Sequence, residues 1–373
     1  MKLRQLSKND TGILKGVAIL CILAHNFFHW MGPIAGTENE FSFKSNNFNR
    51  FIGAFADSPI DSINIIFSYL GHYGVMLFIF ISGYGLATSM MQSAKNYKTF
   101  VIDRAVKLYP LVFVAIVSYY LMSTLIFHRM IDMEGIKSLV YKLLMVHTLI
   151  PGEGLTHIGP LWFAGMIFQL YLLFPLLFKL IMRYGVKAFA VICLFAYVCI
   201  YLCLYIDILP QGISIMQNFI GHLPEFCLGI LFVKLKGIKL NSLYFIIAVI
   251  LFCIGNLYKS FFPFTFISIT YIMLCFYHLS IIKNKVVLAT EKFLAFFGKM
   301  SMMLFATHSI IRAPLVEIAE KANNHLYYYF MFVVFVVTAL FIAFGAKVVY
   351  EWIVNVLISL RIKLINARCE NEK

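Results

Sequence analysis

The sequence predicts an all-α membrane protein, a polytopic bundle of about ten transmembrane helices. Apolar residues make up 61% of the 373 positions, charged residues only 13%, and the mean hydropathy is +0.86. A soluble domain cannot hide that much apolar surface. Apolar stretches near the roughly 20 residues that cross a bilayer recur along the chain. Because they are unbroken and do not alternate in period two, they favour helices over a β-barrel.

The expected spans follow one another without a Pro/Ser-rich linker, so residues 1–373 are interpreted as a single domain. The spans are placed near 12–31, 68–91, 106–127, 160–181, 187–207, 215–233, 241–258, 264–282, 298–314 and 327–358. The first is interpreted as a retained helix, because Asn26, His29 and Trp30 stand where a signal peptidase needs small residues.

Lys and Arg are distributed unevenly between the two sides of this topology. One side, which includes both chain ends, receives 23 of the 31 basic residues. Cytoplasmic loops carry such an excess, so both termini are expected in the cytoplasm. The net charge of +14 is therefore attributed to topology and to contact with anionic membrane lipids, and not to nucleic-acid binding.

The cysteines and the loops narrow the kinds of site that can be expected. Seven of the eight cysteines lie in apolar spans and no CxxC pair occurs, which indicates neither a disulfide framework nor a zinc site. Two outward segments are longer than the others: residues 32–67, and residues 128–159 with an amphipathic stretch at 135–149. Long loops tend to form lids or binding surfaces, so an acceptor-binding side is expected here.

The first span contains the most specific candidate site. His25 and His29 are four residues apart and share a helix face, and Lys15 lies about 15 Å from His25 by helical rise. Ionisable residues at membrane depth are functional candidates, and histidine is the natural general base near neutral pH. The alternative is a histidine that is simply hydrogen-bonded inside the bundle.

Two further motifs carry weaker signals. Arg104 and Lys107 are three apart on one helix face, which suits phosphate binding, although spacing alone favours ordinary anchoring by basic residues. Residues 71–85 contain Ser82 among several glycines, which allow a helix or a ligand to approach closely.

Other polar residues fall within the expected spans. Glu225 needs a partner if it is buried, and His222 is three residues away on the same face. Glu225 could orient an imidazole or bind a cation, and the alternative is a structural Glu–His pair. The other polar residues within the expected spans are Trp162, Tyr171, His278 and His308.

Six short motifs occur in order from the first expected span to the ninth. They are residues 15–19 with His25, residues 74–85 with Ser82, residues 100–110 with Arg104, residues 159–175 with Trp162, residues 223–229 with Glu225, and residues 298–308 with His308. Each motif is weak alone, but in this order they resemble the membrane-bound acyltransferase 3 family.

This resemblance implies an O-acyltransferase, most simply an O-acetyltransferase. Such enzymes are thought to take an acyl group from cytoplasmic acyl-CoA, here acetyl-CoA as the expected donor, and place it on a hydroxyl of an extracytoplasmic sugar or polysaccharide. It also implies a bacterial inner-membrane location. Relatives often carry an additional extracytoplasmic hydrolase-like domain, which is not found here, so a separate partner protein is a further expectation.

The resemblance also assigns roles to the candidate residues. His25 is the expected catalytic histidine and Glu225 the candidate catalytic carboxylate, and no metal is required. The residues expected to hold the phosphates of CoA are Lys15, Arg104 and Lys107. The residues expected to bind substrate are Ser82, Trp162, Tyr171 and His308.

Two other classes of function stay open at this point. A proton-coupled transporter or flippase for an acyl group or a lipid-linked sugar could also use intramembrane His and Glu, but the inverted repeats of many transporters are not seen. A non-catalytic scaffold would make His25 a purely structural residue.

Overall fold

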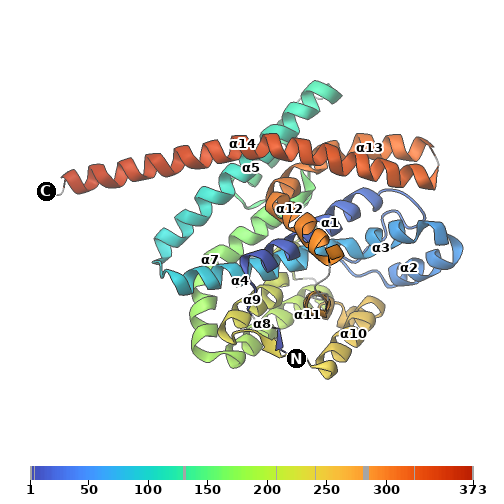
Figure 1. Cartoon of the computed structure of the whole chain (residues 1–373), viewed down its shortest axis with the longest axis horizontal. Coiled ribbons are helices and arrows are strands. Elements are labelled where there is room, and N and C mark those ends of the chain that lie inside the picture. Colours follow the sequence, from blue (N-terminus) through green and yellow to red (C-terminus); the bar gives the residue numbers. More distant parts are fainter. Residues whose placement is uncertain are drawn as a thin grey trace.

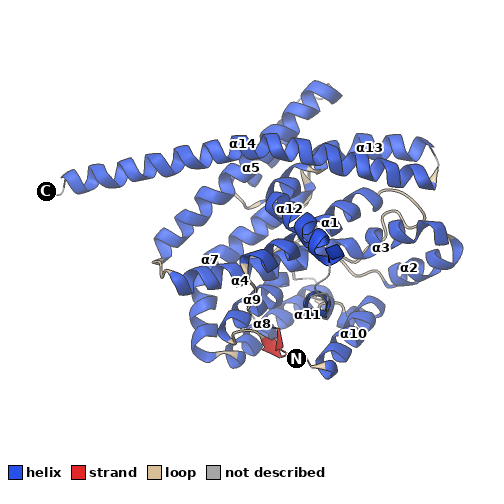
Figure 2. Ribbon diagram, viewed as in Figure 1, coloured by secondary structure: helices blue, strands red, loops and turns tan. Residues whose placement is uncertain are grey.

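The computed structural model describes residues 2–3, 5–128, 132–206, 208–239, 241–279, 285–322 and 324–371. Within them the regular structure is helical except for one short antiparallel pair, β1 (Lys2–Leu3) with β2 (Ile238–Lys239), as Figure 2 shows. The predicted all-α class is therefore confirmed.

The chain forms fourteen α-helices within the described ranges (Figure 1). They are α1 (Lys8–Phe28), α2 (Ser45–Asp57), α3 (Ser62–Leu70), α4 (Gly74–Gln92), α5 (Tyr97–Phe127), α6 (Met133–Leu143), α7 (Trp162–Tyr184), α8 (Val186–Tyr205), α9 (Leu223–Lys234), α10 (Ser242–Leu257), α11 (Phe264–Leu279), α12 (Lys285–Thr307), α13 (Ser309–Ala322) and α14 (His325–Asn371). The 3₁₀ turns between them are η1 (Pro59–Asp61), η2 (Gly71–Tyr73), η3 (His147–Leu149), η4 (Gly159–Leu161), η5 (Ile215–Gln217), η6 (Phe219–His222) and η7 (Lys259–Phe261).

Helix α1 runs through the middle of the molecule, beside α12 and next to α3 and α4 (Figure 1). Its start is defined by a capping box, in which the Ser7 hydroxyl accepts from the Asp10 amide and the Asp10 carboxylate accepts from the Ser7 amide. Most of its apolar side chains are buried, and so is His25 in the last turn. A central helix with a polar residue at its end is suited to present that residue to an enclosed site.

Five helical stretches in the described part of the chain are long and apolar enough to cross a membrane. They are Lys8–Phe28, Pro59–Gln92, Gly159–Tyr184, Val186–Tyr205 and His325–Lys363. A sixth results if α12 and α13 count as one span, although the pair is bent by 81° at its break. The protein is therefore a multi-pass membrane protein, and the expected number of about ten spans stays a prediction.

Several expected spans differ from the observed helices. The span placed at 215–233 is two 3₁₀ turns followed by α9, whose 12 residues extend only about 18 Å. Pro224 lies in the first turn of α9, where its missing N–H costs little, so the helix begins there. The span placed at 298–314 is interrupted between Thr307 and Ser309.

The two apolar helices α10 and α11 have 16 residues each, fewer than the roughly 20 of a perpendicular span. Residues 280–282 of the span placed at 264–282 lie outside the described residues. Both long loops contain helices: α2, η1 and α3 in the first, and α6 with η3 in the second. The amphipathic stretch predicted at 135–149 thus corresponds to α6 and η3.

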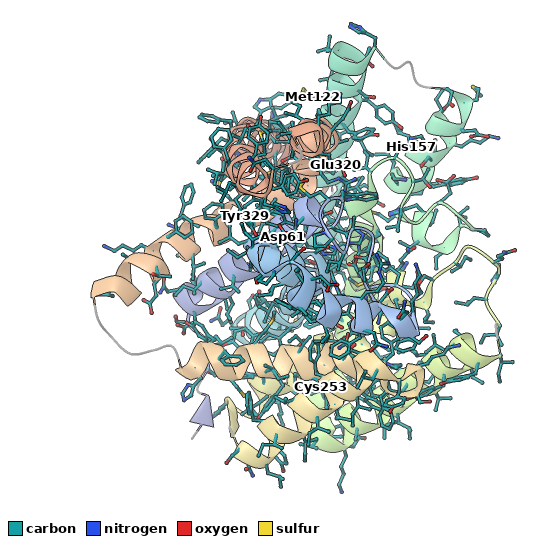
Figure 3. All side chains as sticks on the ribbon, turned by 90° about the vertical axis from the view of Figure 1, so that its right-hand side faces the viewer. Asp61, Met122, His157, Cys253, Glu320 and Tyr329 are labelled. Atoms are coloured by element: carbon teal, nitrogen blue, oxygen red, sulfur yellow. The ribbon has the colours of Figure 1, made fainter. Side chains whose placement is uncertain are left out.

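Helix α14 crosses the upper part of Figure 1 beside α13 and α5. Its N-terminal end is attached to the first long loop, because the Tyr329 hydroxyl donates to the Ile60 carbonyl at 2.9 Å and His325 Nδ1 lies 2.7 Å from Asp61 Oδ1. Asp61 and Tyr329 are adjacent in Figure 3. This attachment holds the segment that precedes α3 close to the end of α1.

Candidate functional site

A pocket of about 300 Å³ lies at the C-terminal end of α1. Its walls come from α1, the first long loop, η2 and α4, the connection after α6, α7, and the α12–α13 break. The lining residues are Ile22, His25, Asn26, His29, Trp30, Glu38, Glu40, Phe41, His72, Val75, Leu155, His157, Gly159, Pro160, Trp162, Phe305 and Arg312. The pocket thus gathers polar side chains from segments that are far apart in the sequence.

His25 is held in one orientation by the backbone of α3. Its Nδ1 lies 3.1 Å from the Ser68 carbonyl oxygen and 3.3 Å from that of Phe67. A carbonyl oxygen only accepts, so Nδ1 carries the ring proton when His25 is neutral, and Nε2 presents a lone pair. A Cβ on Gly71 would lie 2.7 Å from the His25 Cβ, so glycine at this position permits the close packing.

Glu38 is the carboxylate nearest to this lone pair. Its Oε2 lies 3.0 Å from His25 Nε2 and 3.5 Å from His29 Nδ1. The Asn47 amide donates to the Glu38 carbonyl at 2.5 Å and to the Asn39 side-chain oxygen at 3.0 Å. These bonds anchor the loop backbone, so the carboxylate is supplied from a fixed position.

The two carboxyl groups of this loop have different electrostatic surroundings. Burial acts to raise the pKa of Glu38, but the neighbouring His25, His29 and His72 together hold it below its usual value. Burial raises the pKa of Glu40 well above its usual value, and the negative charge of Glu38 adds to this effect. The two neighbouring carboxyl groups therefore have pKa values shifted in opposite directions, and Glu38 is the one ionised at neutral pH.

Arg312 supplies a cation to the same pocket from the first turn of α13. Its Nη1 donates to the Asn26 side-chain oxygen at 3.3 Å, and its guanidinium lies 4.8 Å from the centre of the Trp30 ring. In the described part of the chain it forms no ion pair with a carboxylate. A partly buried arginine in this setting can bind an anionic oxygen.

A second cavity, of about 400 Å³, lies between α5 and α14. The basic residues that line it are Lys95, Arg104, Lys107 and Arg361. Asp103 is the acidic residue among its lining; it pairs with Lys95, and Arg361 Nη1 lies 2.6 Å from its Oδ1. The Arg104 Nε atom is buried and has no hydrogen-bond partner within the ranges that the structure describes. Four cations against one carboxylate make this cavity suited to a polyanion.

The family model described as "Acyltransferase domain" matches residues 12–346. The chain belongs to the acyltransferase 3 family. It is therefore a membrane acyltransferase, as the six motifs predicted. No curated protein and no solved structure is similar enough to this chain to count as a match.

The predicted site residues of this acyltransferase fall into separate groups. His25 and Trp162 line the first pocket, and Arg104 and Lys107 line the second. The Tyr171 hydroxyl interacts with the Ser82 side chain and lies in the field of Arg104, so these three residues are close together. Lys15 lines neither cavity and is half-buried on α1.

Glu225 is not brought to His25. Its carboxylate is buried 3.9 Å from His222 Nδ1 and lines neither cavity, and neither oxygen has a hydrogen-bond partner among the described residues. The contact with His222 is the Glu–His pair that was the structural alternative, and the catalytic role of Glu225 stays a prediction. His308 Nδ1 faces the carbonyl oxygens of Leu304 and Phe305, and its neighbour Phe305 lines the first pocket instead.

Sequence reasoning did not find Glu38 or Arg312 in this acyltransferase. The only pointer to Glu38 was its place in a long loop of a chain with few acidic residues, 17 in all. Arg312 falls on the side of the predicted topology that has few basic residues, which is a signal of function that was available.

Proposed function

We propose that this acyltransferase moves an acyl group, most simply acetyl, from acyl-CoA to a hydroxyl group of a carbohydrate across the membrane. The observation that carries the proposal is the arrangement of His25, with its Nδ1 held by carbonyls and its Nε2 beside the Glu38 carboxylate in an open pocket. This is the arrangement of a general base whose protonated form is stabilised by a neighbouring carboxylate.

In the proposed reaction the acceptor hydroxyl gives its proton to His25 Nε2 as its oxygen attacks the thioester carbon. The negative charge of Glu38 stabilises the imidazolium that forms. Arg312 is the candidate donor to the oxyanion of the tetrahedral intermediate. The C–S bond then breaks, the imidazolium returns its proton to the CoA sulfur, and the O-acyl sugar and free CoA leave. No covalent acyl-enzyme is needed.

The donor is proposed to enter from the cavity between α5 and α14. Lys95, Arg104, Lys107 and Arg361 would bind its phosphates. The excess of Lys and Arg on one side of the chain supports placing this cavity and both termini in the cytoplasm. The aromatic rings of Trp30 and Trp162 at the first pocket suit stacking against a sugar ring entering from the other side of the membrane.

The test is acyl-CoA turnover by purified protein in detergent, with acetyl-CoA and candidate sugars. The wild type is expected to release CoA, and His25→Ala to lower the rate by about 10²- to 10⁴-fold with unchanged acetyl-CoA binding. His278→Ala serves as the control for loss of an imidazole, because His278 is in α11 and lines neither of the two cavities. An equally folded His25→Ala that turns over at the wild-type rate would overturn the proposed role.

A further inference from the structure

Three potential ligand atoms for a metal ion meet in the first pocket. His25, His29 and Glu38 each offer one ligand atom, and these three atoms all lie within 4.8 Å of one another. The two imidazoles are on one face of the α1 terminus, four residues apart, and their ring centres are 4.9 Å apart. The carboxylate arrives from the loop that Asn39 and Asn47 anchor.

The Glu38 carboxylate oxygen lies close to both ring nitrogens, 3.0 Å from His25 Nε2 and 3.5 Å from His29 Nδ1. His29 Nδ1 and Glu38 Oε2 are buried, and neither has a hydrogen-bond partner in the described part of the chain. Because His25 Nδ1 is directed at the Ser68 carbonyl, the Nε2 lone pair faces the carboxylate oxygen 3.0 Å away. Electron-rich atoms that converge in this way are stabilised by a positive charge between them.

The residues around His25, His29 and Glu38 also favour a positive charge at this place. The ring of His72 is buried, and its centre lies 5.4 Å from that of His25. Glu40 adds a second carboxyl group to the pocket lining. The bond from His25 Nδ1 to a backbone carbonyl is the kind of outer contact that orients a metal-binding histidine and selects its tautomer.

We propose that this cluster is a binding site for a divalent transition-metal ion of the zinc class, held by His25 Nε2, His29 Nδ1 and the Glu38 carboxylate. Two imidazole nitrogens and one carboxylate suit Zn²⁺ or Co²⁺, whereas Mg²⁺ and Ca²⁺ prefer oxygen ligands throughout. In a tetrahedral zinc site neighbouring ligand atoms are about 3.3 Å apart, and the carboxylate oxygen lies 3.0 Å and 3.5 Å from the two nitrogens.

The site has a consequence for the reaction, which rests on the proposed function. A metal ion on His25 Nε2 occupies the lone pair that would take the proton of the acceptor hydroxyl. Metal ion and proton therefore compete for one atom, and bound metal inhibits acyl transfer.

The experiment is a titration of the chelator-treated, purified protein in detergent with Co²⁺, followed by the visible absorption of the bound ion and by displacement with Zn²⁺. Wild type is expected to bind one ion with a tetrahedral spectrum. His29→Gln and the isosteric Glu38→Gln are expected to raise the dissociation constant by at least about ten-fold. His278→Ala should bind as wild type does, and melting temperatures exclude unfolded variants.

Absence of binding to wild type, or equal affinity in folded His29→Gln and Glu38→Gln, would disprove the site. CoA release is then measured with and without Zn²⁺, each variant against its own metal-free rate. Zn²⁺ is expected to inhibit the wild type. If the inhibition of His29→Gln weakens by the same factor as its metal affinity, the result supports competition between metal ion and proton for His25 Nε2. Metal binding without inhibition keeps the site and removes the base role of His25; normal turnover without metal binding keeps the proposed function and removes the site.

Discussion

At the scale of single residues, Lys142 shows how burial controls ionisation in this protein. It is 2% exposed on the amphipathic helix α6, and its Nζ donates to the Ser138 hydroxyl at 2.8 Å. Burial lowers its pKa to about 8, against a smaller opposing effect of the Glu153 charge. Between this value and the ordinary lysine pKa near 10.4 the unfolded chain holds a proton that the folded protein has released. The contribution of Lys142 to the free energy of unfolding therefore rises with pH across that window.

Replacing Lys142 with Met is expected to raise the melting temperature at pH 7, where the buried ammonium is charged and costly. The gain should shrink toward pH 10, because the folded wild type is by then largely neutral at this position. Thermal unfolding in detergent at pH 7 and pH 10 measures both effects. Lys137→Met, at an exposed position of the same helix, is the control. An equal gain at both pH values would show that lost charge is not the cause.

At the scale of helices, the crossing of α1 and α12 depends on direct backbone contact. A Cβ on Gly16 would lie 1.9 Å from the Leu294 carbonyl oxygen, and one on Gly298 would lie 1.9 Å from that of Gly12. Small residues at such crossings let membrane helices pack closely, which is the main source of their association in lipid. Since α1 carries His25 and His29, this crossing also sets the position of the first pocket.

Gly16→Ala is expected to lower the stability by about 1–3 kcal/mol, because α1 and α12 must separate to admit the methyl group. Gly12→Ala is the matched control on the same helix, since a Cβ there meets no atom within 4 Å. It should be neutral or stabilising by up to about 1 kcal/mol through helix propensity. The melting temperatures of both variants and of the wild type are measured in one detergent. An equal change in melting temperature for the two variants would contradict the packing argument.

At the scale of the whole molecule, the basic cavity joins the third motif of the sequence to the last helix. Arg104 and Lys107 come from α5, whereas Arg361 comes from α14 and lies beyond the part of the chain that the family model matches. The Tyr350 hydroxyl donates to the Lys107 carbonyl at 3.1 Å, which fastens the two helices together. A basic cavity of this kind exists only when both helices are in place.

Arg361→Gln is expected to weaken acetyl-CoA binding by about three- to ten-fold and to reduce its dependence on salt, because one charge-assisted contact is lost. Lys363→Gln, an exposed position two residues further on the same helix, is the control for net charge. Binding is measured by titration calorimetry at two salt concentrations. Equal weakening in both variants would mean that general surface charge, and not this cavity, attracts the donor.

The sequence by itself determined the features that depend on local pattern. Hydropathy predicts an all-helical membrane protein because each span must satisfy its own backbone groups in lipid. Helical periodicity predicts the shared face of His25 and His29 and that of Arg104 and Lys107, and the six motifs predict the family. These inferences need only the spacing of residues within one helix or the order of short motifs.

Only the tertiary structure decided which residues meet. Glu38 reaches His25 through an irregular loop held by Asn39 and Asn47, and no periodic rule gives the path of such a loop. Arg312 enters the pocket because the chain bends by 81° between α12 and α13. Hydropathy predicts a single unbroken span at 298–314, where this bend occurs. Hydropathy sums over a window and does not register where a helix breaks, so the bend and the carboxylate beside His25 follow from packing alone.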